Sequence, residues 1–474
     1  MSDPTTPIAP PLPDPKGSFR DTVATISEDG KRNWIYPKKP KGDFYNKRTA
    51  VSIFFLILLF AGPFMKINGH PLMLFNILER KFILFGIAFW PQDFHLFVLA
   101  MLTFIVFIIL FTALFGRIWC GWACPQTIFM EMVFRKIEYF IEGDYMQQKA
   151  LNAESPNPVK FRKKFLKNSI FFIISFIIAN TFLSYIIGVD ELFEIISDGP
   201  SQHLGGLISL TIFTLVFYGV YTKFREQACI VVCPYGRLQG VLLDKNSVVI
   251  AYDYQRGEPR EKLHKGLERK AGDCIDCHQC VQVCPTGIDI RHGTQLECVN
   301  CTACIDACDS IMDKIDKPRG LIRYTSENAI AKGIKFKVTP RIIGYSVVLF
   351  ILLGALITLL ALRTDVEATI LRTPGMLYQE LPNQKVSNLY NIKVVNKTFK
   401  NLPIEIKIVE PKGTIQWIGK NFAELKEQDI AEGEFFVILD QKDIVQSKTR
   451  IKIQVISQGK ILGEEESNFI GPTP

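Results

Sequence analysis

The chain has 474 residues, of which 48% are hydrophobic and 22% are charged, and its net charge is +8. A mean hydropathy of only +0.16 alongside 36 Phe residues indicates that apolar and polar residues are segregated into blocks. This composition excludes a wholly disordered chain. The twelve cysteines are too few for a disulfide-rich scaffold, so their placement matters more than their number.

The amino-terminal segment, residues 1–48, is polar and basic. We expect its Pro-rich part, Pro4–Pro15, to be a disordered leader. The segment lacks the short positive-then-apolar layout of a cleaved signal peptide. We therefore expect the first apolar run to act as the membrane-insertion signal.

Five apolar runs approach or exceed the roughly 20 residues that a helix needs to cross a bilayer. Charged residues bracket them, which is typical of membrane spans rather than buried core helices. The predicted spans are Thr49–Met65, Phe94–Phe115, Ser169–Val189, Leu204–Thr222 and Ile342–Leu362. A shorter apolar stretch, Phe82–Pro91, is predicted to be interfacial or re-entrant.

The distribution of Lys and Arg between the spans predicts the orientation of the chain. Nine lie in residues 1–48 and nine in 116–168, against three in 66–93 and none in 190–203. The positive-inside rule therefore places the amino terminus in the cytoplasm. We expect the basic runs to contact lipid headgroups rather than nucleic acid.

This orientation predicts five parts in chain order. They are a cytoplasmic amino-terminal segment (1–48), four transmembrane helices (49–222) with a cytoplasmic loop (116–168), a cytoplasmic segment (223–341), a fifth transmembrane helix (342–362) and a periplasmic domain (363–474). The cysteines all fall on or near the predicted cytoplasmic side. In a reducing compartment, that placement favours metal or redox chemistry over structural disulfides.

Two similar cysteine pairs follow the inner ends of the second and fourth spans. They read Cys120-Gly-Trp-Ala-Cys124-Pro125 and Cys229-Ile-Val-Val-Cys233-Pro234. Proline favours the first position of a helix, so Cys124 and Cys233 are predicted helix N-caps, where the helix dipole favours thiolate. Paired thiolates can share a soft ion such as Cu(I). Buried inert cysteines, or four thiolates holding a third iron–sulfur cluster, remain open alternatives.

Two consecutive cysteine runs carry the strongest signal in the chain. Each has the spacing C-x2-C-x2-C-x3-C of bacterial two-cluster ferredoxins, in which the fourth cysteine of a run ligates the other cluster. We predict this domain at about residues 265–318. Cys274, Cys277, Cys280 and Cys308 are the predicted ligands of one [4Fe–4S] cluster, and Cys298, Cys301, Cys304 and Cys284 those of the second. A zinc ribbon fits this triple spacing poorly.

The last 100 or so residues alternate with the period of β-strands. Ile404, Ile406 and Ile408 alternate with polar residues, and so do Ile451 and Ile453. Turn residues separate such stretches, which indicates several antiparallel strands. We predict a small β-sandwich of immunoglobulin-like type, with a barrel as the alternative.

Taken in order, these motifs resemble the CcoG/FixG/RdxA family of cytochrome c oxidase accessory proteins. The resemblance rests on Trp34–Gly42, Gly116–Gln126, Arg225–Gly236, the doubled ferredoxin run and Asn388–Thr398. It implies a multi-pass bacterial inner-membrane protein with a five-span bundle, an inserted two-cluster ferredoxin-like domain and an immunoglobulin-like tail.

The resemblance also implies a function in assembly of cbb-type cytochrome c oxidase. The expected partners are that oxidase and its copper-delivery factors, together with an electron donor that the sequence does not identify. The implied activity is that of a cupric reductase, with Cys120, Cys124, Cys229 and Cys233 as the residues that handle copper. The alternatives are a quinol-linked ferredoxin relay and a non-catalytic assembly scaffold.

Overall fold

A computed structural model describes most of the chain. The described residues are 24–26, 29–67, 69–77, 81–199, 201–263, 271–333, 339–375, 377–419, 424–444, 446–457 and 459–472. The predicted leader, Pro4–Pro15, lies outside them. The chain divides into two compact units. The first comprises Met1–Gly62, Met101–Ser184 and Val189–Leu352, and the second comprises Pro63–Ala100, Tyr185–Gly188 and Leu353–Pro474.

Among the described residues, five helices are long and apolar enough to cross a membrane, which confirms the predicted spans. They are α1 (Asp43–Ala61, continued by η1, Gly62–Phe64), α2 (Phe94–Phe115, preceded by η2, Pro91–Asp93), α7 (Pro158–Ile187), α9 (Leu204–Gly219, continued by η4, Val220–Phe224) and α15 (Pro340–Ala361). Helix α7 begins eleven residues before the predicted span at Ser169. Its basic first turns are good helix formers, although they are too polar to count toward a hydrophobic run.

Shorter helices connect the spans and form the cysteine-rich segment of the first unit. They are α3 (Ile118–Trp122), α4 (Pro125–Thr127), η3 (Ile128–Phe134), α5 (Arg135–Ile141), α6 (Tyr145–Ala153), α8 (Val189–Asp198), η5 (Ala228–Val232), α10 (Pro234–Leu242), α11 (Tyr254–Gly257), α12 (Gln279–Gln282), η6 (Ile290–His292), α13 (Ala303–Lys314) and α14 (Glu327–Lys332). The π-helical turns η3, η4 and η5 lie beside the two cysteine pairs. Such turns are uncommon and are frequent at functional sites.

An aromatic core packs the stretch after the first cysteine pair against the spans α7 and α9. Phe134 stacks on Tyr221 with ring centroids 4.7 Å apart and meets Phe171 edge-on, also at 4.7 Å. Phe129, Met130 and Ile178 complete this buried cluster. The core therefore holds the segment that follows Cys124 against these two spans.

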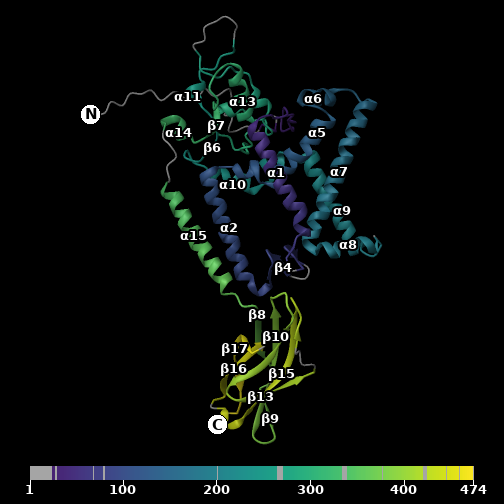
Figure 1. Cartoon of the computed structure of the whole chain (residues 1–474), viewed down its shortest axis with the longest axis vertical. Helices are drawn as coiled ribbons and strands as arrows, with labels where there is room; N and C mark the ends of the chain where they lie inside the picture. Colours follow the sequence, from purple (N-terminus) through teal and green to yellow (C-terminus); the bar gives the residue numbers. More distant parts are fainter. Residues whose placement is uncertain are drawn as a thin grey trace, which may run out of the picture. The chain divides into compact units, whose positions relative to one another are not determined.

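The cysteine-rich segment is closed by two strands that lie far apart in the sequence. Strand β6 (Val249–Tyr252) pairs antiparallel with β7 (Ile322–Thr325), on either side of the predicted range 265–318. The two strands lie close to α13 in Figure 1. Buried apolar residues fill the space between strands and cysteines, and they include Ile250, Ile288, Ile290, Ile305, Met312, Leu321 and Ile322.

The second unit begins with a small β-structure that corrects one prediction. Phe82–Pro91 is not a re-entrant segment: it contributes β4 (Lys81–Leu84) and β5 (Ile87–Phe89), which pair with each other and, through β4, with β3 (Met73–Asn76). Phe85 and Gly86 both have positive φ, as the two-residue turn of a tight hairpin requires. That turn lets a short apolar stretch fold back as strands, which hydropathy by itself does not reveal.

The tail is a two-sheet β-structure, and the predicted immunoglobulin-like fold is confirmed. One sheet has the order β13-β15-β10-β8, with β9 also on β10, and the other has the order β12-β16-β17. The strands are β8 (Val366–Arg372), β9 (Gln379–Leu381), β10 (Lys385–Asn396), β12 (Glu405–Glu410), β13 (Gly413–Ile418), β15 (Ile430–Asp440), β16 (Lys448–Ser457) and β17 (Lys460–Ile470). Small pairs β1 (Lys66–Ile67) with β2 (His70–Pro71) and β11 (Leu402–Pro403) with β14 (Glu424–Leu425) complete the unit, which also contains η7 (Gln441–Asp443). Tyr390, Val394, Phe435, Ile451 and Ile453 lie in the core between the sheets.

A buried carboxylate joins the start of α2 to the tail within the second unit. Asp93 pairs with Arg363 at 2.7 Å and with Lys397 at 2.7 Å. Close by, Phe399 packs against the buried Leu74 and Ile83 of the hairpin sheet. These contacts make the segment between the first two spans part of the same compact body as the β-sandwich.

Candidate metal centre

The eight ferredoxin-type cysteines fall into two groups in the structure. Burial raises the pKa of Cys308, and the thiols of Cys280, Cys274 and Cys277 raise it further, so Cys308 lies near the first three cysteines of the other run. Cys284 in turn lies near the second run. The electrostatic neighbours of Cys304 include Cys301, Cys298 and Cys284. The chain crossing that the spacing predicts therefore has a spatial counterpart.

The two runs repeat an unusual backbone conformation at equivalent positions. Asp276 and His278 of the first run, and Asn300 and Thr302 of the second, all have positive φ. Each of these residues lies between two consecutive cysteines of its run. Left-handed non-glycine residues are uncommon and persist only where the surroundings enforce them. Their repetition indicates two loops that are wound in the same way around two equivalent centres.

The donor set and its surroundings fit four-iron clusters. Cys280, Cys284, Cys298, Cys301 and Cys304 line one enclosed cavity together with Ile250, Ile288, Ile290 and Val299. Thiolate ligands in an apolar shell are the environment that iron–sulfur clusters require. Among the residues that the structure describes, no three thiol, imidazole or carboxylate groups are arranged to hold a single metal ion.

Both C-x3-C-P pairs end at helix N-caps, as predicted. Cys124 is the N-cap residue of α4, and Cys233 is that of α10, with proline at the first helical position in each case. The backbone N–H of Ile128 donates to the Cys124 carbonyl oxygen at 3.0 Å, which starts the helical turn. The proline thus positions the second cysteine of each pair at the amino end of a helix.

The structure brings the two pairs together. Burial raises the pKa of Cys120 to about 11, and the neighbouring thiols of Cys124 and Cys233 add to that effect. Burial likewise raises the pKa of Cys229 to about 12, with further contributions from Cys124, Cys120 and Cys233. The four thiols therefore lie within electrostatic reach of one another. At neutral pH the metal-free Cys120 and Cys229 are protonated thiols, and a metal ion that binds them as thiolates must displace protons.

The first pair packs directly against the second ferredoxin-type run. A side chain on Gly121 would place its Cβ 2.5 Å from the Val299 carbonyl oxygen and 2.7 Å from that of Asn300. Cys120 packs on the buried cluster that contains Val299 and Cys301. Only glycine permits this approach of two backbones. Gly121, which lies between the paired cysteines, thus allows the first pair to lie close to the second ferredoxin-type run.

Several residues that the sequence did not single out support this contact. The side-chain amide of the fully buried Gln239 donates to the Cys120 sulfur at 3.4 Å. Arg48 Nε donates to the Gly121 carbonyl oxygen at 2.6 Å. The Trp122 indole N–H donates to the hydroxyl of Tyr324 on β7 at 3.1 Å. Of these residues, only Arg48 gave a signal in the sequence, because it is a charged residue at the edge of an apolar run.

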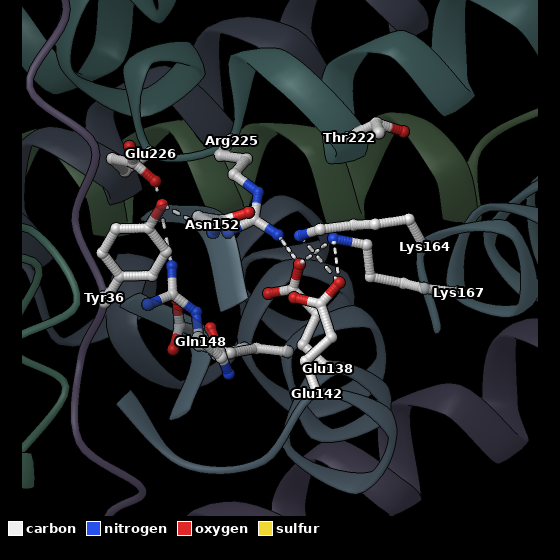
Figure 2. A network of polar contacts seen from close by, with 12 residues as sticks. Tyr36, Glu138, Glu142, Gln148, Asn152, Lys164, Lys167, Thr222, Arg225 and Glu226 are labelled. Atoms are coloured by element: carbon white, nitrogen blue, oxygen red, sulfur yellow. Dashed lines mark hydrogen bonds and ion pairs between the residues drawn. The ribbon is translucent and has the colours of Figure 1, made fainter. Parts of the chain in front are cut away.

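A buried ionic network surrounds Glu138 and Glu142 (Figure 2). Glu138 accepts from Arg225 and pairs with Lys167 at 3.3 Å. Lys167 also pairs with Glu142 at 3.0 Å, and Glu142 pairs with Lys164 at 2.9 Å. The network therefore joins α5 and α7 to the segment that precedes Cys229.

A second part of the network continues to the amino-terminal segment. The fully buried Arg135 pairs with Glu131 at 3.2 Å and with Glu226 at 3.8 Å. Glu226 also pairs with Arg32 at 2.9 Å. The guanidinium groups of Arg32 and Arg225 each lie over the Trp34 ring, at 4.4 and 4.9 Å from its centroid. These contacts connect the segments that carry both cysteine pairs to residues 32–34.

Replacing Glu138 by Gln should destabilise the protein strongly, because it leaves the buried Arg225 and Lys167 without their shared carboxylate. The expected loss is about 3–5 kcal/mol in the free energy of unfolding, measured by denaturation in detergent. Glu327→Gln is the matched control, since the Glu327–Lys245 pair is exposed and 3.7 Å long. The control should lose about 1 kcal/mol or less. Equal losses in the two variants would contradict this expectation.

The role of the Glu138 charge also predicts how the stability difference between wild type and Glu138→Gln depends on pH. Burial by itself would raise the pKa of Glu138, but the charges of Arg225, Lys167 and Arg135 lower it below its usual value of 4.5. A carboxylate with a depressed folded-state pKa contributes stability that is present above the unfolded pKa and is lost as pH falls through the folded pKa. The stability difference between wild type and Glu138→Gln should therefore persist down to about pH 4.5 and shrink below it. A difference that is unchanged at lower pH would argue against the role of the carboxylate charge.

The fold and the site together define a class of protein. Membrane-spanning helices carry an inserted segment with two iron–sulfur centres, and a β-sandwich follows the last helix. The chain is thus a membrane-bound iron–sulfur protein of the electron-transfer class.

Comparisons with known proteins identify the family. Family models match residues 97–141 ("4Fe-4S binding domain"), 224–327 ("4Fe-4S dicluster domain") and 356–472, the immunoglobulin-like fold at the C-terminus of FixG. The chain is 34% identical to protein RdxB of Cereibacter sphaeroides, over 79% of this chain and 81% of that protein. It is 33% identical to RdxA of the same organism, over 77% and 80% of the two chains. It is 38% identical to nitrogen fixation protein FixG of Rhizobium meliloti, over 62% and 58%. The chain belongs to the FixG/RdxA family.

Proposed function

We propose that this protein reduces Cu(II) to Cu(I) at its paired cysteines, with electrons from its iron–sulfur clusters, during assembly of a cbb-type cytochrome c oxidase. One observation carries the proposal: Gly121, between the first two paired cysteines, packs on the backbone of Val299 and Asn300 in the second ferredoxin-type run. The thiols that would hold copper therefore lie next to the centre that would supply the electron.

The chemistry of the residues suits a one-electron reduction of a copper ion. Four-iron clusters, when bound, supply electrons singly, and Cu(II) needs one electron to become Cu(I). Thiolates prefer the softer Cu(I), so binding at Cys120 and Cys124 would favour the reduced ion. Protonated Cys120 and Cys229 release their protons as the metal binds, so retention of copper should strengthen as pH rises.

We also propose an orientation and partners for the protein. The counts of Lys and Arg favour a cytoplasmic amino terminus and cysteine-rich segment, with the β-sandwich in the periplasm. In that orientation the sandwich would face the oxidase and its copper-delivery factors, while the clusters would face an electron donor on the other side. Membrane lipid surrounds the spans.

The test is anaerobic mixing of chemically pre-reduced, detergent-purified protein with Cu(II). Cluster absorbance is followed together with Cu(I) trapped by a chelator. We expect Cu(I) to appear in step with cluster oxidation, one ion for each electron. Reduced clusters that persist unchanged beside Cu(II) would show that the protein relays electrons to another acceptor or serves as an assembly scaffold.

A second candidate for the paired cysteines is a third iron–sulfur cluster. The four thiols lie together, and the family model over residues 97–141, which contains Cys120 and Cys124, describes a 4Fe-4S binding domain. Iron analysis separates the two possibilities. About eight iron atoms per chain favour a copper site at the pairs, whereas about twelve favour a third four-iron cluster.

A further inference from the structure

A groove lies between α7 and α9, and its Lys164 belongs to the ionic network. Its volume is about 490 Å³, within the range of small-molecule sites. Four aromatic rings form half of its lining, and three polar side chains, one of them Ser169, lie among them. Its lining includes Phe161, Lys164, Phe165, Asn168, Phe172 and Tyr218.

The groove contains a polar group that lacks a partner. The Asn168 Oδ1 atom is buried and has no hydrogen-bond partner among the described residues. A buried acceptor without a donor is costly, so a ligand with a hydroxyl group would gain a hydrogen bond there. The rings of Phe161 and Phe165 stack with centroids 6.1 Å apart, and Phe172 meets Tyr218 edge-on at 6.1 Å. Flat rings of this kind favour a flat aromatic ligand.

Charge argues against a phospholipid headgroup as the occupant. The cation in the groove, Lys164, is already paired with Glu142 at 2.9 Å. A phosphate would have to compete with that carboxylate, and the Asn168 oxygen would repel it. An uncharged ring that carries hydroxyl groups meets neither obstacle.

The groove is also connected to the cysteine pairs. Tyr221 follows Tyr218 by one helical turn, and its hydroxyl donates to Gln126 Oε1 at 2.7 Å. Gln126 is two residues after Cys124. On the other side, the carboxylates of Glu142 and Glu138 extend from Lys164 toward Arg225, as Figure 2 shows. Aromatic side chains and ionisable groups thus both lead from the groove toward the redox centre.

We propose that this groove binds the ring of a lipid-soluble hydroquinone, which is the electron donor of the protein. The inference rests on the proposed function in that it names the source of its electrons. Oxidation breaks the two O–H bonds and releases a quinone, two electrons and two protons. The eight ferredoxin-type cysteines would hold two four-iron clusters, which would take up one electron each. The two protons would be released to water one at a time, with the Glu142 carboxylate, which pairs with Lys164 of the groove, as the base for each transfer.

The test measures binding of decylubiquinol, kept reduced under argon, to the full-length protein with pre-reduced clusters in phosphatidylcholine nanodiscs by calorimetry, with empty nanodiscs as the reference. Asn168→Leu removes the acceptor. Asn180→Leu is the matched control on the same helix, because the Asn180 amide donates to the Phe176 carbonyl oxygen of its own helix and is not part of the groove lining. We expect saturable binding to the wild type and the control, and a loss of about tenfold or more in affinity for Asn168→Leu. Tyr218→Leu should weaken binding as well. A loss of affinity in both variants would not depend on a folding defect in one of them.

Two results would overturn the proposal. One is equal affinity in Asn168→Leu and Asn180→Leu, or no saturable binding to the wild type. The other is retention of phosphatidylglycerol by the wild type and its loss from Asn168→Leu in native mass spectrometry, which would make the groove a lipid site. The binding assay uses no copper, and the Cu(II) reduction test uses no hydroquinone, so failure of one leaves the other unaffected.

Discussion

Replacing Cys120 and Cys124 together by Ser should lower the initial rate of Cu(I) formation by at least about 100-fold. A hydroxyl is a harder and weaker ligand than a thiolate, so the variant would neither hold Cu(I) nor keep the ion next to the second cluster. The measurement is the chelator assay with pre-reduced protein.

The iron content and cluster signals of the Cys120 and Cys124 double variant provide the control. Because Cys120 and Cys124 belong to neither ferredoxin-type run, iron content and the spectroscopic signals of both clusters should remain at wild-type levels. An unchanged rate of copper reduction would remove the first pair from the site. A loss of four iron atoms per chain would instead identify the pair as ligands of a third cluster.

Replacing Gly121 by Ala should slow electron transfer to copper without removing any ligand. The new methyl group would overlap the carbonyl oxygens of Val299 and Asn300, so the two backbones must separate. A displacement of about 1 Å at a reacting centre can cost up to about 100-fold in rate. We expect a reduction in the rate of cluster oxidation by Cu(II) of about tenfold or more, measured by stopped-flow absorbance.

Gly219→Ala is the matched control for this variant. Gly219 also lies in a helix, and a Cβ there meets no atom within 4 Å. Alanine should be neutral or slightly stabilising at that position, because its helix propensity exceeds that of glycine. If both variants oxidise at the wild-type rate, the close contact at Gly121 does not govern electron transfer.

Local patterns were sufficient to predict most elements of the fold. Helices such as α2 and α15 could be predicted from their length and hydropathy, since a membrane span must satisfy its backbone hydrogen bonds within itself. Ile451 and Ile453 could be assigned to a core-facing strand because alternation has the period of a strand. The hairpin at Phe85 and Gly86 could not be predicted, because hydropathy does not distinguish a short interfacial or re-entrant stretch from one that folds back as two strands.

Part of the candidate site could likewise be predicted from the sequence, and the other part depends on the tertiary structure. Covalent spacing determines which cysteines share a loop, so the two ferredoxin-type runs and the two C-x3-C-P pairs were recognisable from the sequence alone. The proximity of Cys120 to Cys229, the contact of Gly121 with Val299, and the pairing of Glu138 with Arg225 depend on chain segments more than 80 residues apart. No local pattern encodes such contacts, because they arise only when packing of separate helices excludes water and brings their buried groups together.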